Sequence, residues 1–339
     1  MNSKRLVGYW LLSACVLIMA MVILGGITRL THSGLSMVDW KPIRGIIPPI
    51  DHEQWVIEFD NYKQFPEFQK INKGMTLSDF KMIFFWEYLH RLIGRFIGLY
   101  FIFPFLYFYK KKFLPNGIIK NLLVMFLLGG FQGFMGWYMV KSGLVDNPFV
   151  SHYRLAAHLI IAFILIAYIF WTYLVYFAKK DDNPKLLNRS KLQIVHSLPY
   201  LVLLQIIWGA FTAGLKAGLS WNTFPLMNGQ LIPTGLFGLS PWWLSMFEHH
   251  MTIQFIHRLL GVVIFIIILI IWFRYRSIEI SKLQHLATAS LVIIVTIQFL
   301  LGLFTLLTHV NISLAVIHQA GAGLLLLSSI YTVFRFKSN

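Results

Sequence analysis

Residues 254–272 read QFIHRLLGVVIFIIILIIW, a run whose only charged side chain is Arg258. About twenty apolar residues in a helix are enough to cross the hydrocarbon core of a bilayer. Eight runs of this kind occur along the chain, so we expect an all-α polytopic membrane protein with eight transmembrane helices. The expected spans are residues 6–27, 84–109, 118–140, 155–177, 193–215, 252–273, 285–308 and 312–334.

The composition of the whole chain agrees with a membrane protein. Of the 339 residues, 57% are apolar and only 12% are charged, whereas an ordinary soluble domain has roughly 25% charged residues. A soluble chain this apolar could not cover its own core, which excludes a soluble enzyme, a disordered protein and a collagen. The single cysteine, Cys15, excludes an intramolecular disulfide and a zinc or iron–sulfur site built on cysteines.

The basic residues predict the orientation of the chain. The formal net charge is +16, and the excess of Lys and Arg gathers at the termini and in loops such as 110–112 and 179–180. Cytoplasmic loops carry such an excess, so we expect both termini in the cytoplasm and the long polar segment 28–81 outside, as an ordered cap. The expected partner of these charges is the lipid bilayer, and not nucleic acid. No organelle transit peptide precedes the first span, which favours a multi-pass protein of the bacterial cell (inner) membrane.

The two halves of the chain resemble each other. EYLHRLIG at 87–94 recurs as QFIHRLLG at 254–261, and QGFMG at 132–136 recurs as QFLLG at 298–302. An even number of spans in each unit gives both units the same orientation, in agreement with the charges. We therefore expect two four-helix bundles related by a pseudo-twofold axis along the membrane normal. The two expected halves are residues 1–180, which include the outer loop 28–81, and residues 190–339.

Four histidines occupy matching positions of this repeat: His90, His158, His257 and His318. An imidazole inside a membrane is costly unless it has a partner. A helix–helix hydrogen bond would explain one such residue, but it is a poor explanation for four in register. Zinc would need three or four ligands in one cluster, whereas each half offers two. Two facing imidazoles in an apolar bundle suit a haem iron, so we expect one bis-histidine haem site in each half.

The two expected sites differ in one neighbouring residue. Glu87 precedes His90 by three positions, so both side chains project from one helix face, whereas Gln254 stands at the matching position before His257. An acid beside only one site predicts chemistry in the first half and a permanent haem in the second. The alternative for Glu87 is an exposed carboxylate near a helix N-terminus.

Two arginines follow these histidines directly in the sequence. Arg91 and Arg258 would lie at the polar edge of the expected sites, where haem propionates need cations. Ordinary anchoring of a helix at the membrane interface is the alternative role.

Several motifs together resemble the haem A synthase family. They are GGITRLT at 25–31, SGLS at 33–36, WKPIRG at 40–45, the ExxHR motif at 87–91, and the paired His257 and His318. The resemblance extends from the first span to the last. Relatives in Gram-positive bacteria carry a cysteine pair in an outer loop, and its absence here points to the mitochondrial and alphaproteobacterial branch, Cox15/CtaA.

This resemblance implies an oxidoreductase acting on CH or CH2 groups. Such an enzyme oxidises a methyl group of haem O to the formyl group of haem A, with water as the oxygen source, for use in terminal oxidases. The resemblance makes Glu87, His90 and His158 the expected catalytic residues, with the two histidines on the iron of the substrate. His257 and His318 would ligate the iron of a resident haem b, the expected cofactor.

The resemblance also implies partners: haem O as substrate, a haem O synthase, and cytochrome oxidase assembly factors. The oligomeric state, including a homo-oligomer, stays open. The haem sites are expected towards the periplasmic side.

Two other functions are compatible with paired histidines. A dihaem b-type cytochrome that only transfers electrons across the bilayer should carry haems at both membrane faces, but all four histidines map to one face. A transporter or haem-delivery chaperone should have broken helices at mid-membrane in both halves. Pro104 and Pro199 do not occupy matching positions of the repeat, which makes this third function the weakest of the three.

Overall fold

The structure, a computed structural model, describes residues 3–39, 44–145, 148–179, 181 and 189–337. In this part of the chain there are eleven α-helices, three short 3-10 helices and no strand. Eight of the helices are long and apolar enough to cross a membrane, which confirms the predicted fold class. These are α1 (Ser3–Leu30), α4 (Leu77–Lys110), α5 (Ile118–Lys141), α6 (His152–Phe177), α7 (Arg189–Gly214), α9 (His250–Tyr275), α10 (Lys282–Leu307) and α11 (Ile312–Phe336).

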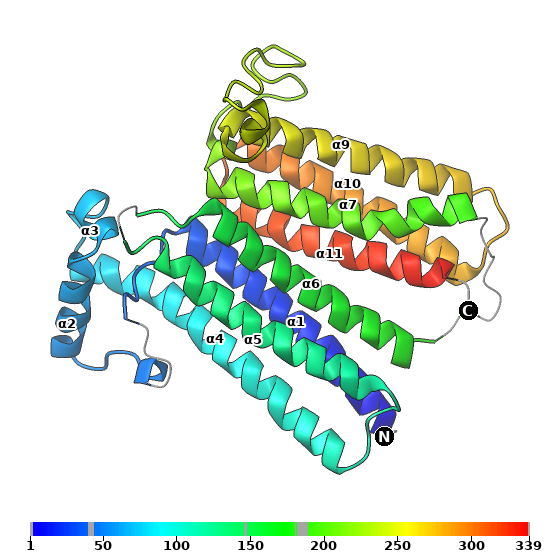
Figure 1. Ribbon diagram of the computed structural model, residues 1–339, viewed down its shortest axis with the longest axis horizontal. Helices are drawn as coiled ribbons and strands as arrows, with labels where there is room; N and C mark the ends of the chain where they lie inside the picture. The colour runs from blue at the N-terminus through cyan, green and yellow to red at the C-terminus, as the bar shows by residue number, and fades with distance from the viewer. Residues whose placement is uncertain (1–2, 40–43, 146–147, 180, 182–188, 338–339) are drawn as a thin grey trace.

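The remaining short helices lie in two long loops. Between α1 and α4 are η1 (Arg44–Ile46), α2 (His52–Lys63) and α3 (Pro66–Lys70), and between α7 and α9 are η2 (Ala217–Leu219), η3 (Trp242–Leu244) and α8 (Ser245–Glu248). Both loops lie at one end of the helical bundle, and both chain termini lie at the other end (Figure 1). The segment 28–81 therefore contains short helices, in agreement with the expected ordered cap.

Helix α4 begins seven residues before the predicted start of its span, at Leu77 rather than Phe84. Thr76 and Asp79 form a capping box, in which the Thr76 hydroxyl accepts from the Asp79 N–H and the Asp79 carboxylate accepts from the Thr76 N–H. The two additional turns pack Phe80 against α2 in a buried aromatic cluster. As a result, His90 lies deeper within its helix than the sequence indicated.

The spans of the two halves pack in corresponding ways. Helix α1 contacts α4 and α6, as α7 contacts α9 and α11, and α5 packs on α6 as α10 packs on α11. Between the halves, α6 contacts α7 and α1 contacts α11. At the end of the bundle that carries the long loops, the Arg29 guanidinium donates to the carbonyl oxygen of Ala213, the residue that matches Arg29 in the repeat. A contact between matching positions is what a pseudo-twofold axis between the halves would produce, so this packing supports the expected repeat.

Candidate functional site

The four repeated histidines form two pairs. His90 on α4 and His158 on α6 lie close enough to interact electrostatically. His257 on α9 and His318 on α11 do the same in the second half. The structure thus brings together the two pairs that the repeat predicted.

Three of these imidazoles carry a buried nitrogen that needs a partner. Nδ1 of His158, of His257 and of His318 makes no hydrogen bond in the part of the chain that the structure describes. Within those same residues, no group of three or more His, Cys, Asp or Glu side chains is placed to hold a metal ion. Paired imidazoles with unpartnered nitrogens fit a haem iron with two axial histidines better than a zinc ion.

Each imidazole of the first pair lies against a glycine of a neighbouring helix. A Cβ added at Gly25 on α1 would lie 3.2 Å from Nε2 of His90. A Cβ added at Gly136 on α5 would lie 3.1 Å from Cε1 of His158. The missing side chain lets the ring approach the helix backbone closely.

The second pair repeats this arrangement. A Cβ added at Gly209 on α7 would lie 3.0 Å from Cε1 of His257, and one at Gly302 on α10 would lie 2.8 Å from Cε1 of His318. Few real Cβ contacts are this short, so the glycines define where the rings can lie. Gly136 and Gly302 belong to the repeated five-residue motif of the third and seventh spans.

The carboxylate of Glu87 is buried, with 3% of the residue exposed. It accepts hydrogen bonds from the Ser36 hydroxyl at 2.7 Å and from the Met37 N–H at 2.8 Å. It also forms an ion pair with Arg91, whose Nη2 lies 2.6 Å from its Oε1. The alternative of an exposed carboxylate at the helix N-terminus is therefore wrong.

Gln254 occupies the matching place in the second half and is equally buried, with 2% exposed. Its Nε2 donates to the carbonyl oxygens of Ala217 at 3.0 Å and Ser220 at 2.7 Å. Ser220 matches Ser36 in the repeat, so the acid and the amide face corresponding loops. The first loop presents donors to a carboxylate, and the second presents acceptors to an amide.

The two arginines brace these same loops. Nη2 of Arg91 donates to the Met37 carbonyl oxygen at 2.9 Å. Nη1 of Arg258 donates to the Thr223 carbonyl oxygen at 2.8 Å, and its Nη2 donates to Trp221, which matches Met37. Contact of either guanidinium with a haem propionate stays a prediction.

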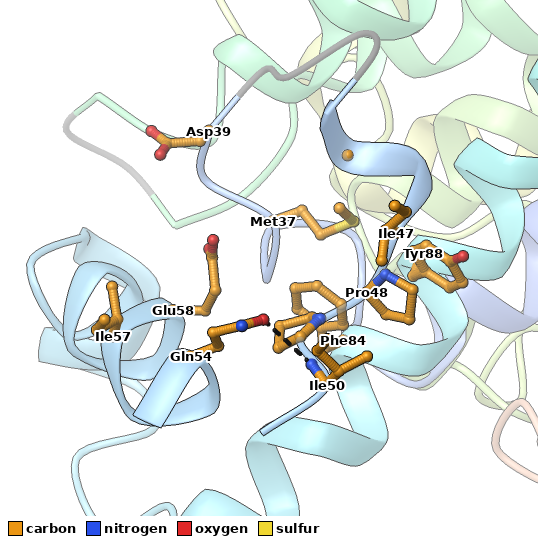
Figure 2. Close-up of a pocket in the computed structure, with 12 residues that line it drawn as sticks. Met37, Asp39, Ile47, Pro48, Ile50, Gln54, Ile57, Glu58, Phe84 and Tyr88 are labelled. Atoms are coloured by element: carbon orange, nitrogen blue, oxygen red, sulfur yellow. Dashed lines mark hydrogen bonds between the residues drawn. The ribbon is translucent and has the colours of Figure 1, made fainter. Parts of the chain in front are cut away.

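A cavity of about 460 Å³ lies between the cap and α4, where the sequence predicted no site. Figure 2 shows side chains from α2, from the 47–50 segment and from α4 around it. Phe84 and Tyr88, three residues before and one residue after Glu87, belong to its wall. None of the four paired histidines lines this cavity.

A second buried carboxylate, Glu67, lies in the cap and was also missed. Only 5% of it is exposed, and its Oε2 accepts a hydrogen bond from the Tyr62 hydroxyl at 3.0 Å. Burial raises the pKa of Glu67 to about 7, against the lowering effect of the Tyr62 hydrogen bond, and the nearby charge of Glu87 raises it further.

The fold and the paired imidazoles define a class of protein: polytopic all-α membrane proteins that carry histidine pairs on their membrane-spanning helices. A model of the COX15-CtaA family, described as cytochrome oxidase assembly protein, matches residues 8–330. The chain belongs to this family.

Several curated relatives cover almost the whole chain. The heme A synthase of Nitrosospira multiformis is 45% identical over 329 residues, which are 97% of this chain and 92% of the relative. That of Flavobacterium johnsoniae is 45% identical over 341 residues, 99% of each chain. That of the Wolbachia pipientis strain wMel is 41% identical over 325 residues, 96% of this chain and 91% of the relative.

Proposed function

We propose that this protein is a haem A synthase, which oxidises a methyl group of haem O to a formyl group and so supplies haem A to terminal oxidases. Similarity to heme A synthases along nearly the full chain supports this proposal. The observation that carries it is the contrast between the halves. One histidine pair has a buried carboxylate on the same helix, and the other has a buried amide.

The proposed roles follow this contrast. His257 and His318 would hold a resident haem b, which supplies one-electron redox chemistry when it is bound. His90 and His158 would hold the iron of the substrate, haem O. Both pairs would then lie towards the periplasmic side of the bacterial inner membrane.

Glu87 is the proposed catalytic carboxylate. Oxidation of a methyl carbon develops positive character at that carbon and releases protons. A carboxylate held in a low dielectric stabilises such a charge or accepts a proton from the carbon. The bonds from Ser36 and Met37 and the ion pair with Arg91 hold the Glu87 carboxylate in place. Conversion of R–CH3 and water to R–CHO releases four protons and four electrons, so water would supply the oxygen of the formyl group and a separate electron acceptor would take up the four electrons.

The proposed reaction also implies one protein that makes its substrate and others that use its product. A haem O synthase would supply the substrate, and a terminal oxidase would receive the product, with cytochrome oxidase assembly factors as further partners.

Pigment analysis tests the proposed function. The protein is purified from cells that make haem O, and its haems are extracted and separated. We expect haem b together with haem O and haem A. Two equivalents of haem b, with neither haem O nor haem A, would instead support a cytochrome that only transfers electrons.

A further inference from the structure

The backbone carbonyl groups of three of the paired histidines each accept a second hydrogen bond, from a glutamine of the adjacent helix. A carbonyl oxygen has two lone pairs, so it can accept this bond in addition to the bond within its own helix. The donors are Gln132 Nε2 to His158 at 3.0 Å, Gln205 Nε2 to His257 at 3.0 Å, and Gln298 Nε2 to His318 at 2.9 Å.

Each of these glutamines stands four residues before the glycine that touches the same histidine ring. The three segments are 132–136 on α5, 205–209 on α7 and 298–302 on α10. Positions i and i+4 lie on one helix face, one turn apart. The amide therefore holds the histidine backbone while the glycine receives its ring, and we call this pair of contacts the cradle.

Each cradle contains a buried polar atom without a hydrogen-bond partner, which destabilises the fold and therefore indicates that the glutamine has a function. Oε1 of Gln132, of Gln205 and of Gln298 is buried and has no hydrogen-bond partner in the described residues. A buried acceptor without a partner is destabilising, and an apolar residue at these positions would avoid this cost. Three such residues at matching places are best explained by the bond that each donates to a histidine.

His90 is the exception. On α1, Met21 stands four residues before Gly25, where the other three helices have glutamine. Met21 fills the same space as Gln205, because a Cβ added at Gly94 would lie 3.3 Å from the Met21 methyl group and one at Gly261 would lie 3.3 Å from Gln205 Nε2. A methionine has no N–H to donate, so within the described residues the carbonyl of His90 lacks the glutamine bond of the cradle.

The ring of His90 also differs from the other three. Gly25 lies nearest to Nε2 of His90, whereas the other three glycines lie nearest to Cε1 of their histidines. His90, which lacks the glutamine bond, is thus also the histidine whose ring presents a different edge to its glycine.

We propose that Met21 makes His90 the first iron ligand to be released in the substrate site, while the glutamine cradles hold His158, His257 and His318 firmly in place as ligands. This inference rests on the proposed function, which places haem O between His90 and His158. Release breaks the bond between the iron and the imidazole nitrogen of His90, which leaves as a neutral ligand, and no electron is transferred. Met21 would be a positioning residue for substrate exchange.

Reciprocal substitutions test this proposal on purified protein that carries haem in both sites. Met21→Gln should slow the transfer of haem O to apomyoglobin about five- to tenfold, the effect of one added hydrogen bond. Gln205→Met should speed the loss of the resident haem by a similar factor. The matched control is Gln319→Met, because Gln319 Nε2 donates to the backbone of Val22 at 2.7 Å and not to a histidine. Unchanged rates in both variants would overturn the proposal.

Two further measurements do not depend on turnover. In the electron paramagnetic resonance spectrum, release of His90 should give the wild-type haem O a high-spin fraction, and Met21→Gln should lower this fraction in favour of the low-spin form with two axial histidines. In the wild-type protein without haem, hydrogen exchange should be faster at the Gly94 amide, one turn after His90, than at the matching Gly261 amide. Equal exchange at the two amides would contradict the weaker hold on the His90 backbone. This measurement uses the wild-type protein, so it stands even if a variant fails to fold.

This test can fail separately from the proposed function. If the protein shows the predicted exchange rates but produces no haem A, the proposed synthase activity is wrong and the proposal of a releasable His90 still holds. If the protein produces haem A but its four histidines are held equally firmly, the synthase activity is supported and the proposal of a releasable His90 is wrong.

Discussion

At the scale of single residues, one difference between the two halves is the charge of a buried side chain. Glu87 accepts from Ser36 and Met37, whereas Gln254 donates to the corresponding loop. The sequence predicted this pair as the point of asymmetry. It could not predict the contacts, because the partners of Glu87 lie about fifty positions away in the chain.

Replacing Glu87 by glutamine tests its role in chemistry. Glu87→Gln keeps the shape of the side chain but removes the proton acceptor, so haem content should persist while haem A formation falls by about two orders of magnitude. Pigment extraction and turnover measure the two effects. Ser36→Ala is the control, since it removes one hydrogen bond to Glu87 and keeps the carboxylate. Normal turnover in Glu87→Gln would remove this residue from the mechanism.

The glycines offer a second test at this scale. In Gly302→Ala the new Cβ would lie 2.8 Å from the His318 ring, so the ring must shift and the second half should lose most of its haem. The haem-to-protein ratio of the purified protein measures this loss. Gly133→Ala is the matched control, because a Cβ there meets nothing within 4 Å. Full haem content in Gly302→Ala would show that the ring does not depend on this close approach.

At the scale of elements, the apolar runs predicted every span, but not where α4 begins. Ser78, Asp79 and Lys81 interrupt the apolar pattern, so its first two turns were assigned to the loop. The capping box at 76–79 was the available signal for the true start. The glutamine cradles were beyond prediction: the repeated Gln and Gly spacing was visible, but the histidine that each motif contacts depends on how the helices pack.

The stability of the cap on α4 should depend on pH through the titration of Glu67. Because the pKa of Glu67 is raised from its ordinary 4.5 to about 7, the folded cap binds a proton that the unfolded chain releases between these values. The contribution of Glu67 to the stability of the cap should therefore be fully present below pH 4.5 and be lost, by about 3 kcal/mol, as the pH rises to 7. Limited proteolysis of the α2–α3 region across this range measures the change. Glu67→Gln should flatten the profile, and an unchanged profile in that variant would assign the effect to another group.

At the scale of the whole molecule, both long loops lie at one end of the bundle and both termini at the other. The hydrophobic pattern and the repeat were sufficient for this arrangement, because eight spans connected in order leave few alternatives. Which end faces the cytoplasm rests on the distribution of basic residues.

Cysteine labelling in intact cells tests the orientation. Cys15 is buried in α1, so a Cys15→Ser background provides a chain without other cysteines. Leu231→Cys, in an exposed part of the loop between α7 and α9, should react with a membrane-impermeant maleimide added outside. Lys112→Cys, between α4 and α5, should react only after the cells are opened. The opposite pattern would invert the topology.

The most direct test of the central claim, that each histidine pair holds a different haem, is the pigment content of two matched variants. His257→Ala should lose the resident haem b and keep haem O, whereas His158→Ala should keep haem b and lose haem O. If both variants lost the same pigment, or if both kept the full complement, the assignment of the two haems to the two halves would be wrong.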